Sequence, residues 1–167
     1  MQYTIRPISQ NDISFLWEML YESLFVRDGQ EVFSKEIINE PFLLKYVEGW
    51  GRQGDFGFIA ISNEAQPIGS ITARFYNESN KGFGYVDEDA PEIGMALLKE
   101  YRGRGIGTAL LDELFKEATR KNISRISLSV DPINKDAVKL YQRFGFEEVC
   151  MVGTSITMVA NVNGILL

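Results

Sequence analysis

The stretch from residue 92 to residue 121 constrains the fold of this chain more than any other. It opens with the strand-like run EIGMALL (92–98), continues through the turn YRGRG and ends in a helical pattern over 106–121. Ile106, Leu110, Leu114 and Ala118 recur every four residues there, which places them on one face of a helix. An apolar strand that leads through a tight turn into an amphipathic helix predicts a sheet with a helix packed on it.

The rest of the chain alternates between strand and helix periodicities. Strands are expected at 3–7, 56–62, 68–76 and 124–130, and in the late runs FEEVCMV and SITMVAN. Helices are expected at 9–25, 40–50 and 134–146, with the acidic run 77–92 as a loop. The order β-α-α-β-β-β-α-β-α-β-β predicts an α/β (α+β) fold, a mixed sheet with helices packed on it.

Length and composition limit the class of protein. With 167 residues, 45% of them apolar, and no repeat or linker, we expect one domain over residues 1–167. The apolar runs are shorter than a membrane span, and the first residues lack the apolar core of a signal peptide. The single Cys150 cannot form an internal disulfide. These features predict a cytoplasmic protein that does not act on a membrane.

The absence of histidine and the acidic charge exclude several chemistries. Because the chain has no histidine, a Ser-His-Asp or Cys-His mechanism and a His-containing zinc site are impossible, and no metal is expected. The formal net charge of −6 argues against nucleic acid as a partner and is compatible with a cationic small molecule or peptide. Acid–base chemistry must come from carboxylates, tyrosine, lysine, the cysteine or water.

The turn at the start of the third helix has the composition of an anion site. Gly103, Gly105 and Gly107 alternate with other residues just where the helix begins. The N–H groups of a helix's first turn have no partner within the helix and lie at the positive end of its dipole. Glycines remove the side chains that would keep a phosphate away from these donors. Many such turns bind nothing, so composition alone leaves both interpretations open.

Two common phosphate-binding motifs do not match this turn. A P-loop requires G-x-x-x-x-G-K-[S/T], and no Lys–Ser/Thr pair follows these glycines. A dinucleotide-binding turn requires G-x-G-x-x-G or -A. Counted from Gly103 the last position is Thr108, and counted from Gly105 it is Leu110. Neither class of nucleotide site is expected.

A third pattern matches. Residues 102–107, RGRGIG, follow R/Q-x-x-G-x-G/A after a strand, which is the acyl-CoA-binding signature of the GNAT superfamily of N-acetyltransferases. SVDPINKDAVKLYQRFGF (129–146) is similar to that family's second signature, an Asn followed by a helix that carries Leu-Tyr and ends in Gly-Phe. The chain resembles the family over nearly its whole length. The resemblance implies a mixed, mostly antiparallel central sheet of about seven strands, flanked by helices.

The resemblance also implies roles for particular residues. Acetyl-CoA would be the donor, its diphosphate held by the N–H groups of the turn with charge added by Arg102 and Arg104. The strand at 95–97 would pair with the pantetheine arm through Met95 and Leu97. Tyr141 would return a proton to the leaving thiolate. The residues assigned to the donor are Met95, Ala96, Leu97, Arg102, Gly103, Arg104, Gly105, Ile106, Gly107, Thr108 and Asn134.

The base that takes the proton of the acceptor amine is expected among the acidic residues before the turn. Glu92 begins the strand, where the family often places such a base, but it is equally interpretable as a solvated carboxylate at a strand end. Glu88 and Asp89 are alternatives for the base. Together with Asp87 these carboxylates favour a cationic acceptor, or they are simply solvated.

Other candidates have structural interpretations beside the functional ones. Tyr141 has the spacing of a core aromatic, and Asn134 that of the N-cap of its helix. Cys150 lies in an apolar, strand-like run, which predicts a buried, inert thiol and therefore direct transfer without an acyl-enzyme. Five residues lie where the family builds acceptor pockets, although packing or exposure explains them as well: Tyr46, Trp50, Asp55, Phe83 and Tyr85.

The predicted function is transfer of an acetyl group from acetyl-CoA to a primary amine of a small molecule or peptide, in a ternary complex. The alternative is a catalytically inactive module of the same fold that binds CoA as a sensor or interaction domain. An unrelated phosphate-binding protein would leave the second signature a coincidence. The fold does not choose among amine acceptors. By analogy with the family, a homodimer that pairs the final strands is possible.

Overall fold

The computed structural model describes residues 2–163, and the elements in that range follow the predicted order. Strands are β1 (Tyr3–Pro7), β2 (Phe56–Ser62), β3 (Pro67–Arg74), β4 (Glu92–Leu97), β5 (Arg125–Val130), β6 (Glu147–Val152) and β7 (Ser155–Asn161). Helices are α1 (Ile13–Glu22), α2 (Pro41–Leu44), α3 (Ile106–Arg120) and α4 (Lys135–Arg143). Short 3-10 turns precede α1, α2 and α3 at Gln10–Asp12, Lys35–Asn39 and Lys99–Tyr101.

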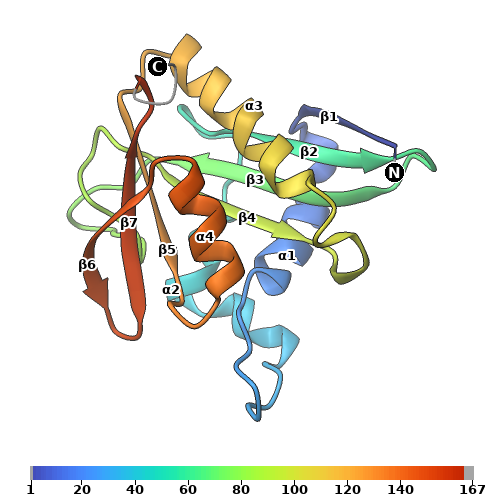
Figure 1. The fold of residues 1–167 in the computed structure, drawn as a ribbon, viewed down its shortest axis with the longest axis horizontal. Coiled ribbons are helices and arrows are strands. Elements are labelled where there is room, and N and C mark those ends of the chain that lie inside the picture. The colour runs from blue at the N-terminus through green and yellow to red at the C-terminus, as the bar shows by residue number, and fades with distance from the viewer. Residues whose placement is uncertain (1, 164–167) are drawn as a thin grey trace. The chain divides into compact units, whose positions relative to one another are not determined.

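The seven strands that the structure describes form one sheet in the order β1-β2-β3-β4-β5-β7-β6 (Figure 1). β1 pairs antiparallel with β2, and β7 pairs antiparallel with both β5 and β6. β4 and β5 run parallel, with Glu92 opposite Ser127. The predicted mixed, mostly antiparallel sheet is therefore confirmed.

The contacts within the chain gather into two compact units. The first takes in the chain up to Thr72 together with Met95–Leu110, and the second takes in Ala73–Gly94 and the chain from Leu111 onward. The boundary passes through β3, β4 and α3, so each unit contains part of these elements. That residues 1–167 form one domain stays a prediction.

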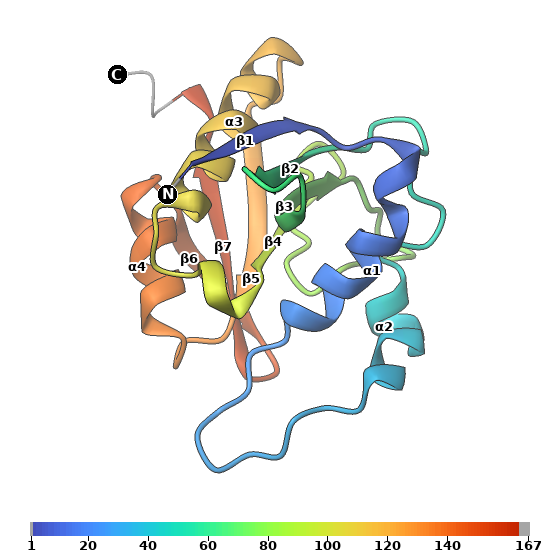
Figure 2. The ribbon, with the colours of Figure 1, turned by 90° about the vertical axis from the view of Figure 1, so that its right-hand side faces the viewer.

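In the first unit, α1 and α2 lie side by side, and the chain between them loops away before it returns (Figure 2). Their buried side chains form one cluster with residues from β2 and β4: Phe15, Leu16, Met19, Leu20, Leu43, Val47, Trp50, Ile59 and Ala96. The predicted helix at 40–50 is shorter than expected, because after Leu44 the chain continues as tight turns in which Val47 and Trp50 N–H groups bond three residues back. Residues three apart align in such turns, so both side chains still reach the core.

In the second unit, α4 runs beside β5 and β7 (Figure 1). Ile126, Leu128 and Val130 of β5 lie opposite Ala160, Met158 and Ile156 of β7, and all six are buried. Aromatic rings complete this core, with Phe115 of α3 5.5 Å from Phe144 and 6.0 Å from Phe146 between ring centroids. The apolar positions predicted for the third helix are therefore confirmed as core positions.

The prediction for Cys150 is wrong, because the structure exposes it. β6 is the last strand of the sheet, and all six of its residues are exposed, including Val149, Met151 and Val152. A short apolar run in a sequence does not reveal whether its strand lies at the centre or at the edge of a sheet. An edge strand has a neighbour on one side only, so its side chains are covered less.

Candidate functional site

The turn before α3 leaves open space in front of the helix. Gly103 and Gly105 have φ values of 73° and 83°, a left-handed conformation that glycine adopts without strain. Apart from the glycine and its two chain neighbours, no described residue has an atom within 4 Å of where a Cβ would stand at either position. The Ala109 N–H donates to the Gly105 carbonyl at 3.1 Å, so the N–H groups of 105–108 precede the helical ladder and have no carbonyl partner within the helix. These donors and this space fit a diphosphate.

The backbone of β4 is oriented as the pantetheine prediction requires. The Leu98 N–H donates to the Ile68 carbonyl of β3 at 2.9 Å, so Leu98 and Ala96 direct their backbone groups toward β3. Successive residues of a strand alternate, and Met95 and Leu97 therefore direct their N–H and C=O groups to the other side. Pairing of these groups with a ligand stays a prediction.

The two arginines of the turn are engaged in different ways. Arg102 Nε donates to the Leu97 carbonyl at 3.1 Å, and its Nη2 lies 3.5 Å from the Glu22 carboxylate at the end of α1. Arg102 therefore fastens the turn to β4 and α1. Arg104 is exposed, with its guanidinium 5.7 Å from the centroid of the Tyr101 ring. Arg104 is the better placed of the two to add charge for an incoming anion.

Glu92 is buried at the start of β4, with 6% of its surface exposed, so its interpretation as a solvated carboxylate is wrong. Its neighbours along the sheet are also polar and buried. Ser127 of β5 lies directly opposite, fully buried. The hydrogen bond between Ile68 and Leu98 sets the register of β3 and β4 and places Arg74 opposite Glu92. Only 2% of Arg74 is exposed. A buried guanidinium needs an opposite charge nearby, and Glu92 is suited to supply it.

Arg74 and Ser127 were not found from the sequence. Arg74 lies in the β-branched and aromatic run ITARFY, where a single charged residue suggests the end of a strand. Ser127 lies on the polar side of an alternating strand, which normally faces solvent. A loop covers that side here, so both residues are buried in the second unit.

The acidic loop before β4 divides into paired and exposed carboxylates. Asp87 forms an ion pair with Arg125 of β5, and the hydrogen bond from that guanidinium lowers the pKa of Asp87. Asp87 Oδ1 also accepts a hydrogen bond from the Asp89 N–H at 2.9 Å. Glu88 and Asp89 are exposed. Asp87 therefore anchors the loop, whereas the other two are solvated.

Tyr141 and Asn134 lie on α4. The Tyr141 side chain is buried, with its ring edge-on to Phe146 at 5.6 Å, and burial raises the pKa of Tyr141 to about 12. Asn134 is confirmed as the N-cap of α4, where its side chain accepts a hydrogen bond from the Ala137 N–H at 3.4 Å. The catalytic role of Tyr141 and the ligand contact of Asn134 stay predictions.

The structure gives contacts for all five acceptor-pocket candidates, and a role for them in binding an acceptor stays a prediction. Trp50 and Tyr46 pack in the core of the first unit. Asp55 accepts hydrogen bonds from the Gly51 and Arg52 N–H groups and so closes a turn. Phe83 is exposed at the side chain, and its carbonyl accepts a hydrogen bond from Thr157. The Lys81 ammonium nitrogen lies over the Tyr85 ring, 5.7 Å from the ring centroid.

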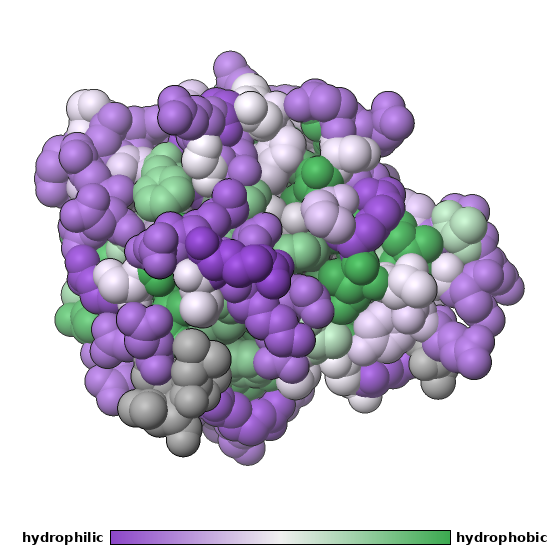
Figure 3. All heavy atoms as spheres, turned by 90° about the horizontal axis from the view of Figure 1, so that it is seen from above, coloured by the Kyte–Doolittle hydropathy of each residue, from purple (hydrophilic) through white to green (hydrophobic). Residues whose placement is uncertain are grey.

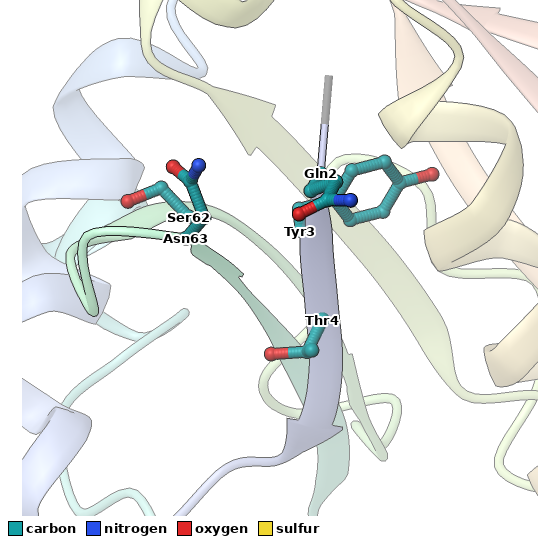
Figure 4. Close-up of a pocket in the computed structure, with 5 residues that line it drawn as sticks. All are labelled: Gln2, Tyr3, Thr4, Ser62 and Asn63. Atoms are coloured by element: carbon teal, nitrogen blue, oxygen red, sulfur yellow. The ribbon is translucent and has the colours of Figure 1, made fainter.

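An open pocket of about 470 Å³ lies elsewhere, between β1 and the end of β2 (Figure 4). It is lined by Gln2, Tyr3, Thr4, Ser62 and Asn63, none of which is a predicted site residue. The Tyr3 ring points to the opposite side of β1 from Ser62 and Asn63. The pocket has no charged side chain and carries no evident chemistry.

Residues 2–163 contain neither a candidate metal site nor a candidate membrane-spanning helix. No group of three or more Cys, Asp or Glu side chains is arranged to hold a metal ion there. No helix in that range is both long and apolar enough to cross a membrane. The face of the molecule in Figure 3 is largely hydrophilic, with apolar side chains in small groups.

Comparison with known proteins agrees with both signatures. Residues 16–146 match the model of the acetyltransferase (GNAT) family. An uncharacterized N-acetyltransferase of Methanocaldococcus jannaschii is 25% identical over 161 residues, covering 96% of this chain and 67% of that protein. An N-alpha-acetyltransferase of Sulfurisphaera tokodaii is 40% identical over 101 residues, covering 59% of this chain and 60% of that protein.

A solved structure has the same fold. The PaiA N-acetyltransferase from Thermoplasma acidophilum, in complex with coenzyme A, superposes with a TM-score of 0.70 at 23% identity, covering 96% of this chain and 99% of that one. The family model covers most of the chain, including the glycine turn and the Asn134 helix. The chain therefore belongs to the acetyltransferase (GNAT) family.

Proposed function

We propose that this chain transfers an acetyl group from acetyl-CoA to a primary amine, by direct attack of the amine in a ternary complex. The observation that carries the proposal is the turn before α3, where bare glycines at positive φ leave the first N–H groups of the helix open in a member of this family. The turn at Gly153 has similar open space, so what distinguishes the turn before α3 is the set of helix N–H donors together with the family signature.

Acetyl-CoA would supply a thioester, whose acyl carbon accepts a nucleophile and whose sulfur leaves as a thiolate. The N–H groups of 103–108 would bind its diphosphate, with Arg104 adding charge. The outward backbone groups of Met95 and Leu97 would pair with the amides of the pantetheine arm, and Asn134 would contact the same arm.

Proton transfers on the acceptor and on the sulfur would complete the reaction. The amine nitrogen forms a bond to the acyl carbon, the carbon–sulfur bond breaks, and the nitrogen loses one proton. Glu92, directly or through water, would accept that proton. Tyr141 would give its proton to the thiolate. Because the pKa of Tyr141 is raised to about 12, its hydroxyl stays protonated throughout the neutral range and is available as a donor.

The α-amino group of a peptide is the first acceptor to test. An α-amine has a pKa of about 8, against about 10.4 for a lysine side chain, so more of it is neutral and nucleophilic near pH 7. The related Sulfurisphaera protein is an N-alpha-acetyltransferase. Spermidine, free amino acids and lysine complete the set, because the fold alone does not choose among amines.

The donor site is tested by calorimetric titration of acetyl-CoA into the wild type, Gly105→Glu and Gly153→Glu. Glutamate at 105 would fill the space before α3 and repel the diphosphate. Gly153 is a matched control, because it is also exposed, has a φ of 61° and, beyond its two chain neighbours, has no described residue within 4 Å of a Cβ. Binding by the wild type and the control, lost in Gly105→Glu, supports the site.

Release of CoA in the presence of each amine then separates the two functions. Turnover by the wild type that falls in Glu92→Gln and Tyr141→Phe supports the transferase. Tight binding of acetyl-CoA without turnover of any amine would favour a non-catalytic CoA-binding module instead. If a folded wild type does not bind acetyl-CoA, both interpretations fail.

A further inference from the structure

Ser127 occupies an unusual position for a serine. Residues alternate along β5, so Ser127 and Ser129 project from the face opposite to Ile126 and Leu128. Glu92 of β4 lies directly across from Ser127, and residues opposite each other on neighbouring strands project from the same face. Two polar side chains, one of them the proposed base, therefore stand next to each other inside the second unit.

The Ser127 hydroxyl is fully removed from solvent. The residue has no exposed surface, and its Oγ has no hydrogen-bond partner among the described residues. The Oε1 atom of Glu92 is also removed from solvent. Burial of a hydroxyl without a partner opposes folding, and a packed alanine would avoid that cost. A serine at this position is explained by a polar group to which its hydroxyl donates a hydrogen bond.

The loop before β4 closes this face of the sheet. A Cβ at Gly84 would lie 2.5 Å from the Leu128 carbonyl carbon, so the loop backbone rests directly on β5. Thr157 Oγ1 donates to the Phe83 carbonyl at 3.2 Å, and Asp87 pairs with Arg125. These contacts keep bulk solvent away from this face, and a hydrogen bond to a carboxylate is stronger where bulk solvent is kept away.

We infer that Ser127 is a positioning residue for Glu92, donating a hydrogen bond to its carboxylate through one buried water. The inference rests on the proposed role of Glu92 as the base. The bond holds the Glu92 carboxylate in one orientation. It also favours the ionised form, which is the form that accepts a proton.

Other charges near Glu92 affect its titration and are held constant in the test. Arg74 lies level with Glu92 on β3, and Arg125 projects from β5 on the same face as Ser127. The loop contributes three carboxylates, of which Asp87 is paired with Arg125: Asp87, Glu88 and Asp89. The variants below leave all of these residues unchanged.

The test compares Ser127→Ala with Ser129→Ala, a serine two residues along the same strand and the same face. CoA release is measured from pH 5 to 9 with acetyl-CoA and a peptide that has a free α-amine, or with spermidine if the peptide is not acetylated. We expect kcat of Ser127→Ala to fall about tenfold, which corresponds to one hydrogen bond to a charged group. The KM for acetyl-CoA stays unchanged, and the acid limb of kcat/KM moves to higher pH.

Ser129→Ala is expected to retain the wild-type kcat and the wild-type pH profile of kcat/KM. Equal losses of kcat in Ser127→Ala and Ser129→Ala, accompanied by equal falls in Tm, would assign Ser127 a merely structural role and overturn the inference. Wild-type kinetics in Ser127→Ala at every pH would overturn it as well, while the proposed function stands. If the wild type acetylates no amine, the proposed function fails and this inference with it. Should Ser127→Ala not fold, Ser127→Cys replaces it, and its weak S–H donor is expected to give the same shift.

Discussion

Tyr141 is a buried residue with a titratable hydroxyl. Its phenol leaves water on folding, and this burial raises its pKa to about 12 from an ordinary value near 10. Between these values the unfolded chain loses the proton and the folded chain keeps it. The free energy of unfolding therefore decreases as pH rises through that window.

We expect Tyr141 to make the protein sensitive to alkali. Between pH 10 and pH 12 the wild type loses roughly 2–3 kcal/mol of stability through this group, on the scale of two pKa units. Tyr141→Phe lacks the hydroxyl, so its urea midpoint is expected to depend less on pH in that range. Parallel curves for the two proteins would show that the phenol is not buried.

At the scale of elements, Asp12 joins β1 to the start of α1. Its carboxylate accepts hydrogen bonds from Arg6 Nη1 at 2.7 Å and Nη2 at 2.8 Å, and from the Ser9 N–H at 2.7 Å. The hydrogen bond from Arg6 is the main cause that lowers the pKa of Asp12. This network holds the 3-10 turn Gln10–Asp12 that precedes α1, and Asp12 is also the N-cap of α1.

We expect Asp12→Asn to cost roughly 2 kcal/mol at pH 7, because hydrogen bonds to a charged group are lost and Arg6 is partly solvated. A carboxylate with a lowered pKa stabilises the fold above its unfolded value, near 3.9, and this stabilisation disappears as pH falls through the folded pKa. The difference in the free energy of unfolding between Asp12→Asn and the wild type should therefore narrow below about pH 4. Urea unfolding at several pH values measures it, with the exposed Asp112→Asn as control. A difference that stays constant with pH would contradict the ionic origin.

At the scale of the whole molecule, binding of the donor is linked to folding. A ligand that binds only the folded state stabilises it by about 2.7 kcal/mol at one hundred times its Kd. For a chain of this size that corresponds to a rise in Tm of about 5–10 °C. We expect such a rise with acetyl-CoA and a much smaller one with pantetheine, which lacks the diphosphate. Thermal unfolding by circular dichroism measures both, and equal shifts would argue against a diphosphate site in the turn.

The sequence by itself determined what local periodicity and motif spacing encode. The element order, the apolar face of α3, the N-cap at Asn134 and the glycine turn all follow from residues close together in the chain. The family followed from two signatures with the correct spacing and order. These features depend on backbone conformation and short-range hydrogen bonds, which neighbouring residues specify.

Only the tertiary structure decided which polar residues are buried and which apolar ones are not. Glu92 was expected at a strand end with solvent as one option, and it is buried level with Arg74 and Ser127. Cys150 was expected inside and lies on an exposed edge strand. Burial depends on which strands become neighbours and on which loop covers a face. These arrangements come from contacts between distant residues, so no local pattern in the sequence contains them.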